Sequence, residues 1–416
     1  MLPSLDANYP ALILKMSRGV IHHGGLAVAR TLGRAGVPVY AVVEDAWAPL
    51  ALTRYLTKAF VWDSYPNDTE SFVKAMSVIG KFIGRPTIVI PMDDLSAVFL
   101  AANAASLTPW FILPPVPPEL PHRLANKACF HALCAEIGIP SARTVFPHSL
   151  DDVRAFAEET TFPVLVKGAE QWAPLKDMSS TRVIQTRDQL STFCENYNDQ
   201  GSRRLIIQEY IPGDDWISHG YYNPEKNVSV TFTGRKLRSY PSDAGSTALG
   251  LSIDNEALYH VSEKLLRVVG YAGIIDMDWR RDERDGQFKI LDCNPRVGQN
   301  FRMFENTAGI DVVRAQHLDL SGRRIDDAAL VESRLFSVES FYVLALLRGL
   351  PRGASKQDAA KYLPPKSREL AWWSSDDPIP VFIMSMRLVL RILGRAFGFR
   401  PETSLPGSRL SRLFSQ

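Results

Sequence analysis

Four side chains with oxygen donors lie close together in two neighbouring segments of the chain, GIIDMDW and QFKILDCN. Both segments have the apolar residues of β-strands, and the polar turn at residues 284–286 suits a three-residue hairpin loop with glycine in the left-handed position. Such a loop sets Asp278 opposite Asp292, and Asp276 opposite Asn294. Because side chains alternate faces along a strand, all four are expected to point to the same side.

Three carboxylates and an amide at such close quarters repel one another unless a cation lies among them. Hard oxygen ligands of this kind suit Mg2+, which binds a few carboxylates and completes its shell with phosphate oxygens and water. Arg296 follows shortly after, and its guanidinium can hold a carboxylate or phosphate through two parallel hydrogen bonds. The alternative is a solvent-facing hairpin with ordinary surface charge, but two polar pairs in matching register, followed by an arginine, favour a metal site.

The pattern DMDW…DCNPR resembles the metal-binding end of the ATP-grasp superfamily, in which an acid on one strand and an acid-x-Asn on the next hold two Mg2+ on ATP. The resemblance implies Asp278, Asp292 and Asn294 as metal ligands, with Asp276 as a weaker candidate and Mn2+ as an alternative ion. One departure is that the family commonly has glutamate where Asp278 and Asp292 stand. Aspartate is one methylene shorter, so the ion or the flanking strand must shift slightly.

The bulk composition sets limits on the class of protein. The chain has 416 residues, of which 46% are hydrophobic and 22% charged, as in soluble globular proteins of two or three domains. A formal net charge of +2 gives no overall basic field that would call for nucleic acid. The four cysteines lack metal-site spacing and the start lacks a secretory pattern, so reduced thiols and a cytoplasmic protein are expected. The sequence contains no P-loop, GxGxxG, GxSxG or HExxH motif.

Residues 1–120 alternate strand and helix patterns, which predicts a doubly wound parallel sheet of Rossmann-like type. The resemblance implies a domain that precedes the ATP site and helps to bind the acid or the amine. In such sheets ligands lie beyond the carboxyl ends of the strands. The expected elements are strands at Ala11–Lys15, Val37–Val43 and Thr87–Pro91 and helices at Leu26–Ala35 and Thr69–Phe82, and the polar loop candidates are Ser17, Arg18, His22–Gly25, Glu44, Asp45, Asp93 and Asp94.

Residues 121–320 are expected to form the nucleotide module, with a small lid at 121–205 and a larger metal and substrate part at 206–320. Lys127 begins a predicted helix, and Lys167 ends a buried strand, where a lysine is costly without an anionic partner. The resemblance implies that both lysines contact the nucleotide. The loop at 168–180 occupies the position of the family's flap but is poor in glycine, and Lys176 in it is a candidate phosphate ligand.

The segment QEYIPG resembles the family's hinge, which recognises adenine. A strand that ends here can offer the backbone C=O of Glu209 and the N–H of Ile211 side by side to the adenine edge, with Tyr210 between them. Asp214 or Asp215 would accept hydrogen bonds from the ribose hydroxyls, and the sequence leaves the choice between them open.

Three cations lie close together after the strand pattern VSVTFT. A solvated basic loop is the usual explanation for such a run. Next to a metal–phosphate centre, Lys236 and Arg238 are instead expected to stabilise charge on the transferred phosphoryl group.

The C-terminal segment, 321–416, is expected to be helical, with one helix at Phe336–Arg348 and a basic amphipathic helix at about 379–399. This helix carries three arginines at intervals of four residues, Arg387, Arg391 and Arg395, which places them on one stripe. Three charges in one helix argue against a membrane-spanning segment. The pattern suits a helix on an anionic membrane surface, and the alternative is a helix packed on the protein body.

The combined prediction is an α/β chain, α+β in the nucleotide module, with the ATP-grasp fold. It resembles carboxylate–amine ligases grouped with D-aspartate ligases, which implies ATP- and Mg2+-dependent amide formation through an acyl phosphate. The expected partners are a small-molecule or carrier-linked carboxylate and an amine, such as an amino acid. The alternatives are an ATP-grasp phosphoryl transferase and a non-catalytic nucleotide-binding scaffold. The expected location is the cytoplasm, with the inner face of the membrane as a peripheral site, and the oligomeric state stays open.

Overall fold

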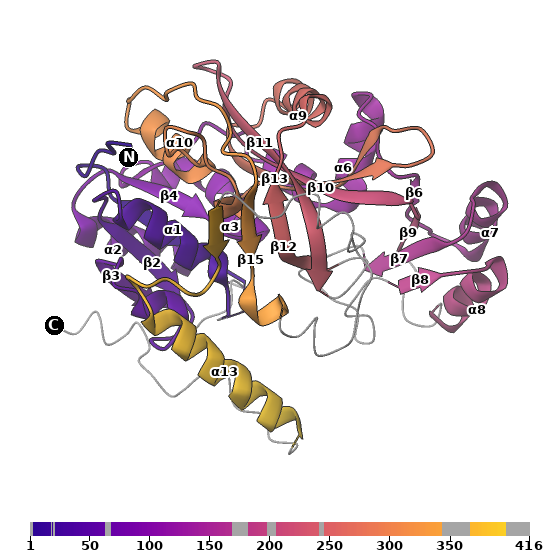
Figure 1. The fold of residues 1–416 in the computed structure, drawn as a ribbon, viewed down its shortest axis with the longest axis horizontal. Helices are drawn as coiled ribbons and strands as arrows, with labels where there is room; N and C mark the ends of the chain where they lie inside the picture. The colour runs from indigo at the N-terminus through magenta and orange to yellow at the C-terminus, as the bar shows by residue number, and fades with distance from the viewer. Residues whose placement is uncertain are drawn as a thin grey trace.

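The computed structural model describes residues 3–17, 19, 21–62, 68–168, 182–197, 205–240, 245–342 and 367–396. These residues form three β-sheets with helices packed against them (Figure 1). The predicted α/β fold class is confirmed, whereas the boundaries at 120 and 320 stay predictions.

The N-terminal part contains five short strands: β1 (Ala11–Leu14), β2 (Val39–Val43), β3 (Lys58–Val61), β4 (Thr87–Pro91) and β5 (Phe111–Ile112). They form a parallel sheet in the order β3-β2-β1-β4-β5, as the alternating pattern predicts. Sequence alone missed β3 and β5, which are short and close the two edges. Helices α2 (Thr69–Ile83) and α3 (Asp94–Ala102) pack on one face, and α1 (His23–Gly33) packs on the other.

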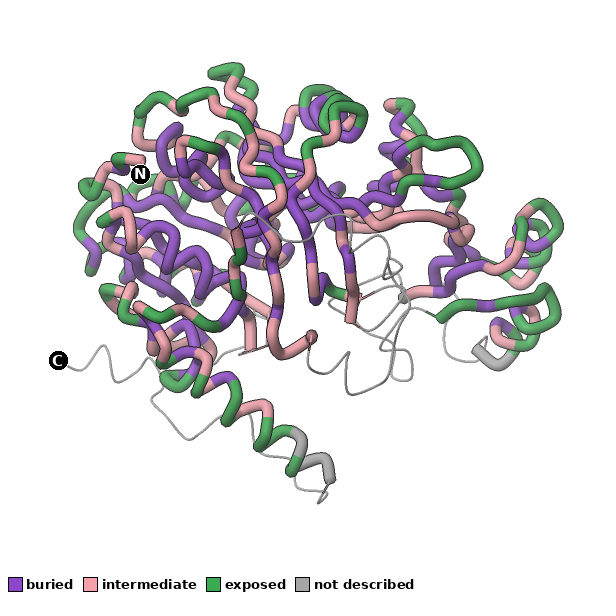
Figure 2. The backbone as a smooth tube through the Cα atoms, viewed as in Figure 1, coloured by how far each residue is buried: buried purple, intermediate pink, exposed green. Residues whose placement is uncertain are grey.

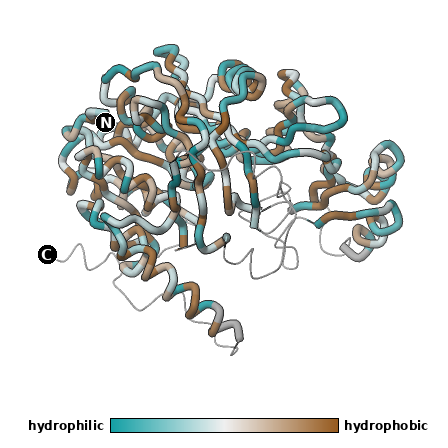
Figure 3. The backbone as a smooth tube through the Cα atoms, viewed as in Figure 1, coloured by the Kyte–Doolittle hydropathy of each residue, from teal (hydrophilic) through white to brown (hydrophobic). Residues whose placement is uncertain are grey.

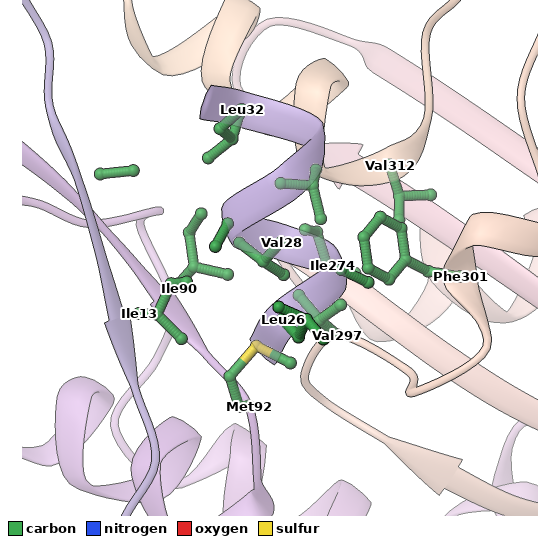
Figure 4. Packing of buried hydrophobic residues seen from close by; sticks show 14 of the residues in the cluster. Ile13, Leu26, Val28, Leu32, Ile90, Met92, Ile274, Val297, Phe301 and Val312 are labelled. Carbon is green, nitrogen blue, oxygen red and sulfur yellow. The ribbon is translucent and has the colours of Figure 1, made fainter. Parts of the chain in front are cut away.

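Helix α1 begins at His23, three residues before the predicted start at Leu26. The side chain of His22 accepts a hydrogen bond from the N–H of Gly25 and so caps the helix. The two glycines of this first turn have low helix propensity, which hides the start of the helix in the sequence. The helix lies between the first sheet and the central part of the chain, where Leu26 and Val28 share one buried cluster with Ile274 (Figure 4).

The second sheet has seven strands: β10 (Gly213–Asn223), β11 (Val228–Tyr240), β12 (Ser246–Ser252), β13 (Gly273–Asp282), β14 (Phe288–Asn294), β15 (Arg334–Ser337) and β16 (Ser367–Leu370). Their order is β14-β13-β10-β11-β12-β15-β16, and every neighbouring pair is antiparallel except β15–β16. Helix α9 (Glu256–Val269) covers one face. Helix α10 (Val312–Leu320) covers the other face and also contacts α1.

The third sheet is small, with β6 (Thr144–Val145), β7 (Val164–Gly168), β8 (Arg182–Ile184) and β9 (Leu205–Glu209) in the order β6-β9-β7-β8. Helices α7 (Leu150–Glu159) and α8 (Arg187–Tyr197) pack on it and give it a core of its own. This unit lies at the right of Figure 1, away from the first sheet. It is joined to the rest through α5 (Leu120–Ala125) and α6 (Lys127–Glu136).

The prediction of a helix at Phe336–Arg348 is wrong at its start. Phe336 lies in β15, whose residue Leu335 pairs with Leu251 of β12, and a helical stretch begins only at residue 339. The apolar run fits either structure, and the pairing with β12 decides between them, because tertiary contacts override local propensity. Residues 343–366 lie outside the described part of the chain.

Helix α13 (Ile379–Ala396) occupies the predicted basic segment. The segment before it is fixed to α1 by two ion pairs, Arg30–Asp377 at 2.9 Å and Arg34–Asp376 at 2.8 Å. Beyond this anchor the helix extends away from the body, with much of its surface exposed (Figure 2). Among the described residues, no helix has the length and apolar character needed to cross a membrane.

The arginine stripe does not face outward as a whole. Arg387 turns toward the protein body, where its guanidinium lies 2.7 Å from Asp45 and donates to the backbone oxygen of Trp47. Arg387 is therefore neither in water nor among lipid headgroups, because the Asp45 carboxylate binds its guanidinium through charge-assisted hydrogen bonds. Arg391 is exposed, and the side chain of Arg395 lies outside the described part.

Candidate active site

The hairpin β13–β14 sets the four oxygen-bearing side chains opposite one another as predicted. Asp276 pairs with Asn294 and Asp278 pairs with Asp292. The three-residue loop is wrong, because the N–H of Asp282 donates to the carbonyl oxygen of Gln287, which leaves four residues in the turn. An extra residue in β14 restores the register, since the pairing shifts between Asp278 and Trp279, and the residue without a partner is Leu291.

These side chains face a cavity of about 400 Å3 between the large sheet and the small one. Of the predicted site residues, ten line it: Lys127, Lys167, Glu209, Ile211, Asp215, Lys236, Asp278, Asp292, Asn294 and Arg296. The weaker metal candidate, Asp276, also lines it. Residues more than 160 positions apart are thus brought to one cavity.

Three predicted residues do not line the cavity, and a fourth lies outside the described part. Asp214 forms an ion pair with Arg235, whereas its neighbour Asp215 faces the cavity and lies 2.6 Å from Arg280. The ring of Tyr210 lies under the same Arg280 guanidinium, at 5.5 Å. Arg238 lies over the ring of Tyr342 instead of the cavity, and Lys176 lies outside the described residues.

Two lysines line the cavity, Lys127 at the start of α6 and Lys167 on β7 of the small sheet. Lys167 donates to Gln208 Oε1 at 2.8 Å. Burial, together with the charge of Lys127, lowers the pKa of Lys167 to about 8. An anion placed between the two lysines would offset both effects. The side chain of Glu209, by contrast, accepts from the N–H of Arg143 and lies 3.2 Å from Arg284, so it ties the lid strand to the hairpin turn.

At the centre, Asp278 lies 2.6 Å from the Nζ of Lys236. Burial raises the pKa of the Asp278 carboxyl above its ordinary value even though Lys236 opposes the shift. The site therefore favours a further cation. Within the part of the chain that the structure describes, no three His, Cys, Asp or Glu side chains converge closely enough to hold a metal ion by themselves. The donor set fits an ion that takes Asp278, Asp292 and Asn294 and completes its shell with phosphate oxygens.

Asp276 has a different environment from the other two carboxylates. One of its oxygens lies 2.9 Å from His219 Nε2 and the other 2.7 Å from Arg296 Nη1. Burial alone would raise the pKa of Asp276, but these two neighbours hold it well below its usual range. Both oxygens thus have partners within the protein, and Asp276 is poorly suited to bind a metal ion.

The far end of the cavity is lined by neutral polar groups and one histidine. Asn300 donates to Thr247 Oγ1 at 3.0 Å, and Ser246 and Gln299 lie beside them. His23, at the start of α1, completes this end, and burial lowers its pKa to about 4, so the ring is neutral at physiological pH. Burial also raises the pKa of Asp94, which lies behind Arg296, to about 6.

The other loop candidates of the first sheet have structural contacts. Asp93 caps α3 and accepts from the N–H groups of Met16 and Ser17. Glu44 pairs with Lys15, Asp45 pairs with Arg387, and Arg18 lies outside the described residues.

Sequence reasoning missed His219, Gln299 and Asn300. A single histidine inside a strand, or an amide after a turn, carries no signal of its own. Only the pairing of His219 with Asp276 across β10 and β13 reveals it. Asn300 could have been suspected from its position soon after Arg296.

Comparison with known proteins identifies the three-sheet arrangement as the ATP-grasp fold. No family model matches the chain. The D-aspartate ligase of Enterococcus faecium is 24% identical over 303 residues, which cover 69% of this chain and 72% of the ligase.

Two solved structures agree with this match. The biotin carboxylase domain of Hydrogenobacter thermophilus 2-oxoglutarate carboxylase, in complex with MgADP, ADP and bicarbonate, is 17% identical with a TM-score of 0.57, covering 77% of this chain and 71% of its own. The L-amino acid ligase of Bacillus licheniformis is 15% identical with a TM-score of 0.56, covering 76% and 75%. These matches confirm the predicted ATP-grasp fold and the resemblance to carboxylate–amine ligases. The predicted enzyme class agrees with the names of both ligases.

The lowered pKa of Lys167 predicts a pH dependence of nucleotide affinity. Below about pH 8, Lys167 of the protein without nucleotide is already charged, so the affinity for ADP should not change with pH. Above that pH binding must take up a proton, so the Kd should rise by up to about tenfold per pH unit. The phosphates keep a constant charge there, because their second pKa is about 6.

The measurement is titration with a fluorescent ADP analogue from about pH 7 to about pH 9.5. Lys167→Arg is the matched control and should give a flat profile over this range, because a guanidinium stays charged. A flat profile in the wild-type protein would contradict a role for Lys167 at the phosphates.

Proposed function

We propose that the protein is an ATP- and Mg2+-dependent ligase that joins a carboxylate to an amine. One observation carries this proposal: a single cavity collects oxygen ligands from β13 and β14, two lysines from α6 and the small sheet, and Arg296 from the segment after β14. Such a set of charges suits a nucleotide triphosphate with a metal ion and an acid beside its terminal phosphate.

The nucleotide would lie on the lid side. Lys127 and Lys167 would hold phosphate oxygens, and Lys176 is a further candidate in the flap position. The backbone of Glu209 and Ile211 would meet the adenine edge beside Tyr210. Asp215 is favoured over Asp214 for the ribose hydroxyls, because it faces the cavity and Asp214 is paired with Arg235.

Asp278, Asp292 and Asn294 would hold Mg2+, with two ions as the expected number and Mn2+ as a substitute. Bound there, the metal would neutralise charge on the phosphate oxygens and orient them. Asp276 is left out of the ligand set, since its partners are His219 and Arg296.

The proposed reaction has two steps. An oxygen of the substrate carboxylate attacks the terminal phosphorus of ATP, the bond from that phosphorus to ADP breaks, and an acyl phosphate forms. The amine then attacks the acyl carbon, loses a proton and expels inorganic phosphate, which leaves an amide. The part played by the protein is positioning and charge stabilisation, and it needs no covalent nucleophile.

Lys236 and Arg296 are the cations that would hold the carboxylate and the growing negative charge. Lys236 is within reach of the metal centre, since it pairs with Asp278. Arg238 is a weaker candidate than it was from sequence, because its guanidinium lies over Tyr342. The neutral end formed by Ser246, Thr247 and Asn300 is suited to the polar part of an amino acid.

The test is ADP release with Mg-ATP against amino acids given singly and in pairs. Release that needs both an acid and an amine is expected, and release with the acid alone would favour a phosphoryl transferase.

With the active pair, Asp292→Ala or Asn294→Ala should reduce ADP formation at least about a hundredfold and leave the fold intact by circular dichroism. Asp285→Ala, in the exposed hairpin turn, is the matched control and should act like wild type. Near-normal turnover in either site variant would exclude the proposed metal site, and ADP binding without turnover would favour a scaffold.

We also propose that α13 lies on an anionic membrane surface. The helix is largely apolar (Figure 3), lacks acidic residues and leaves Arg391 exposed. Trp373 just before it is exposed too, and tryptophan favours the membrane interface. Six exposed apolar residues form a continuous stripe at helical spacing: Ile379, Phe382, Met386, Val389, Leu390 and Leu393.

Flotation with anionic and with neutral liposomes tests this surface. The intact protein should float with anionic vesicles, and the double variant Phe382→Glu/Val389→Glu should lose most of that binding. Ser385→Glu, exposed on the same helix but beside the stripe, is the control and should retain more binding. The surface assignment fails if the intact protein does not float, or if the double variant floats as well as wild type.

A further inference from the structure

A row of mostly buried charged and polar groups crosses the large sheet at the wall of the cavity. His219 on β10 lies opposite Asp276 on β13, which lies opposite Asn294 on β14. Arg296 follows β14 and returns to the same carboxylate. The row is separate from the neighbouring one that holds Asp278 and Asp292, although both rows belong to the same hairpin.

Asp276 links His219 and Arg296. His219 Nε2 lies 2.9 Å from its Oδ1, and Arg296 Nη1 donates to its Oδ2 at 2.7 Å. The side chain of His219 has no exposed surface and that of Asp276 is 11% exposed. Each oxygen of this buried carboxylate therefore has a partner within the protein.

Arg296 is held at several points of its guanidinium. Besides Asp276, Nη1 donates to the carbonyl oxygen of Val297 at 3.2 Å, and Nε lies 3.6 Å from Asp94 Oδ1. Among the described residues, no hydrogen bond from Nη2 is found. Because Arg296 lines the cavity, Nη2 is the nitrogen left to meet an anion there.

The backbone after Arg296 closes tightly over the same row. A Cβ at Gly298 would lie 2.3 Å from His219 Cε1 and 2.7 Å from Asp276 Cγ, so only glycine fits. On its other side the His219 ring packs against Phe304, with ring centroids 5.0 Å apart. The row is therefore enclosed on two sides, which fixes the rotamers of its members.

We infer that His219 and Asp276, with Asp94 behind them, are positioning residues that hold Arg296 in place to bind the acid substrate or the phosphate derived from it. Asp276 serves this purpose instead of binding metal. The inference rests on the proposed function, because it assigns an anion to the end of the cavity beyond the nucleotide. Side chains that hold a substrate-binding group in place commonly matter about as much as the group itself.

The first experiment separates positioning from metal binding. The Mg2+ dependence of binding is measured with a fluorescent ADP analogue for wild type, Asp276→Asn and Asp292→Asn. We expect Asp292→Asn to raise the half-saturating Mg2+ concentration at least about tenfold, and Asp276→Asn to stay within about twofold of wild type. An equal rise in both variants would make Asp276 a metal ligand and overturn the inference.

The second experiment uses inorganic phosphate as the anion, with Mg-ADP bound. Half-saturation is read from the rise in Tm, because a ligand of the native state raises it. Asp276→Asn and His219→Leu should each raise the half-saturating phosphate concentration at least about tenfold, close to the effect of Arg296→Met. His219→Gln keeps a polar hydrogen on the side chain and should recover most of the loss.

The control for general damage is Asp282→Asn. Asp282 is a buried aspartate of the same strand, but its partners Arg284 and Lys289 lie at the turn of the hairpin. The Asp282→Asn variant should have a lower Tm and a phosphate affinity within about twofold of wild type. The inference would be overturned, and the proposed function would stand, if phosphate affinity were unchanged in Asp276→Asn and His219→Leu. The same holds if wild type with Mg-ADP bound did not bind phosphate. Failure of wild type to bind the ADP analogue would instead remove the proposed function and the inference with it.

Discussion

The cavity depends on the antiparallel pairing of β13 with its two neighbours, β14 and β10. This pairing places two polar rows side by side, so that Asp278 and Asp292 lie next to Asp276 and Asn294. The burial of so many carboxylates is costly unless each has a cation nearby. Lys236 and Arg296 meet part of that need, and His219 lies beside Asp276. Burial raises the pKa of the Asp278 carboxyl in spite of Lys236, so a divalent cation beside it would be favourable.

The rest of the fold holds these rows against the other walls of the cavity. Helix α1 joins the first sheet to the large one through a shared core, and its first residue, His23, lines the cavity. The ring of His23 contacts Trp372 at a centroid distance of 5.7 Å, in the segment that α1 also grips through Arg30 and Asp377. Helix α1 therefore contacts both the cavity and the segment that precedes α13. The small sheet has a separate core, as suits a lid.

Short-range patterns made much of the site predictable. Alternation along two adjacent strands was enough to predict that Asp278 lies opposite Asp292. The predicted turn was one residue too short and the bulge at Leu291 was not predicted, but these two errors shift the register in opposite directions and cancel. What sequence could not supply depends on non-local contacts. His219 acquires its role only from β10–β13 pairing, and Phe336 becomes a strand residue because β12 lies beside it. Arg387 turns inward because Asp45, 342 positions earlier, is within reach.

The central claim is that the acid is activated by transfer of a phosphoryl group to its carboxylate. The most direct measurement uses an acid labelled with 18O in the carboxylate, Mg-ATP and the amine, followed by mass spectrometry of the released phosphate. In the proposed reaction the oxygen that attacks phosphorus stays with the phosphate when the amine displaces it. One labelled oxygen per phosphate is therefore predicted. Amide formation with unlabelled phosphate would contradict an acyl phosphate and require another mode of activation.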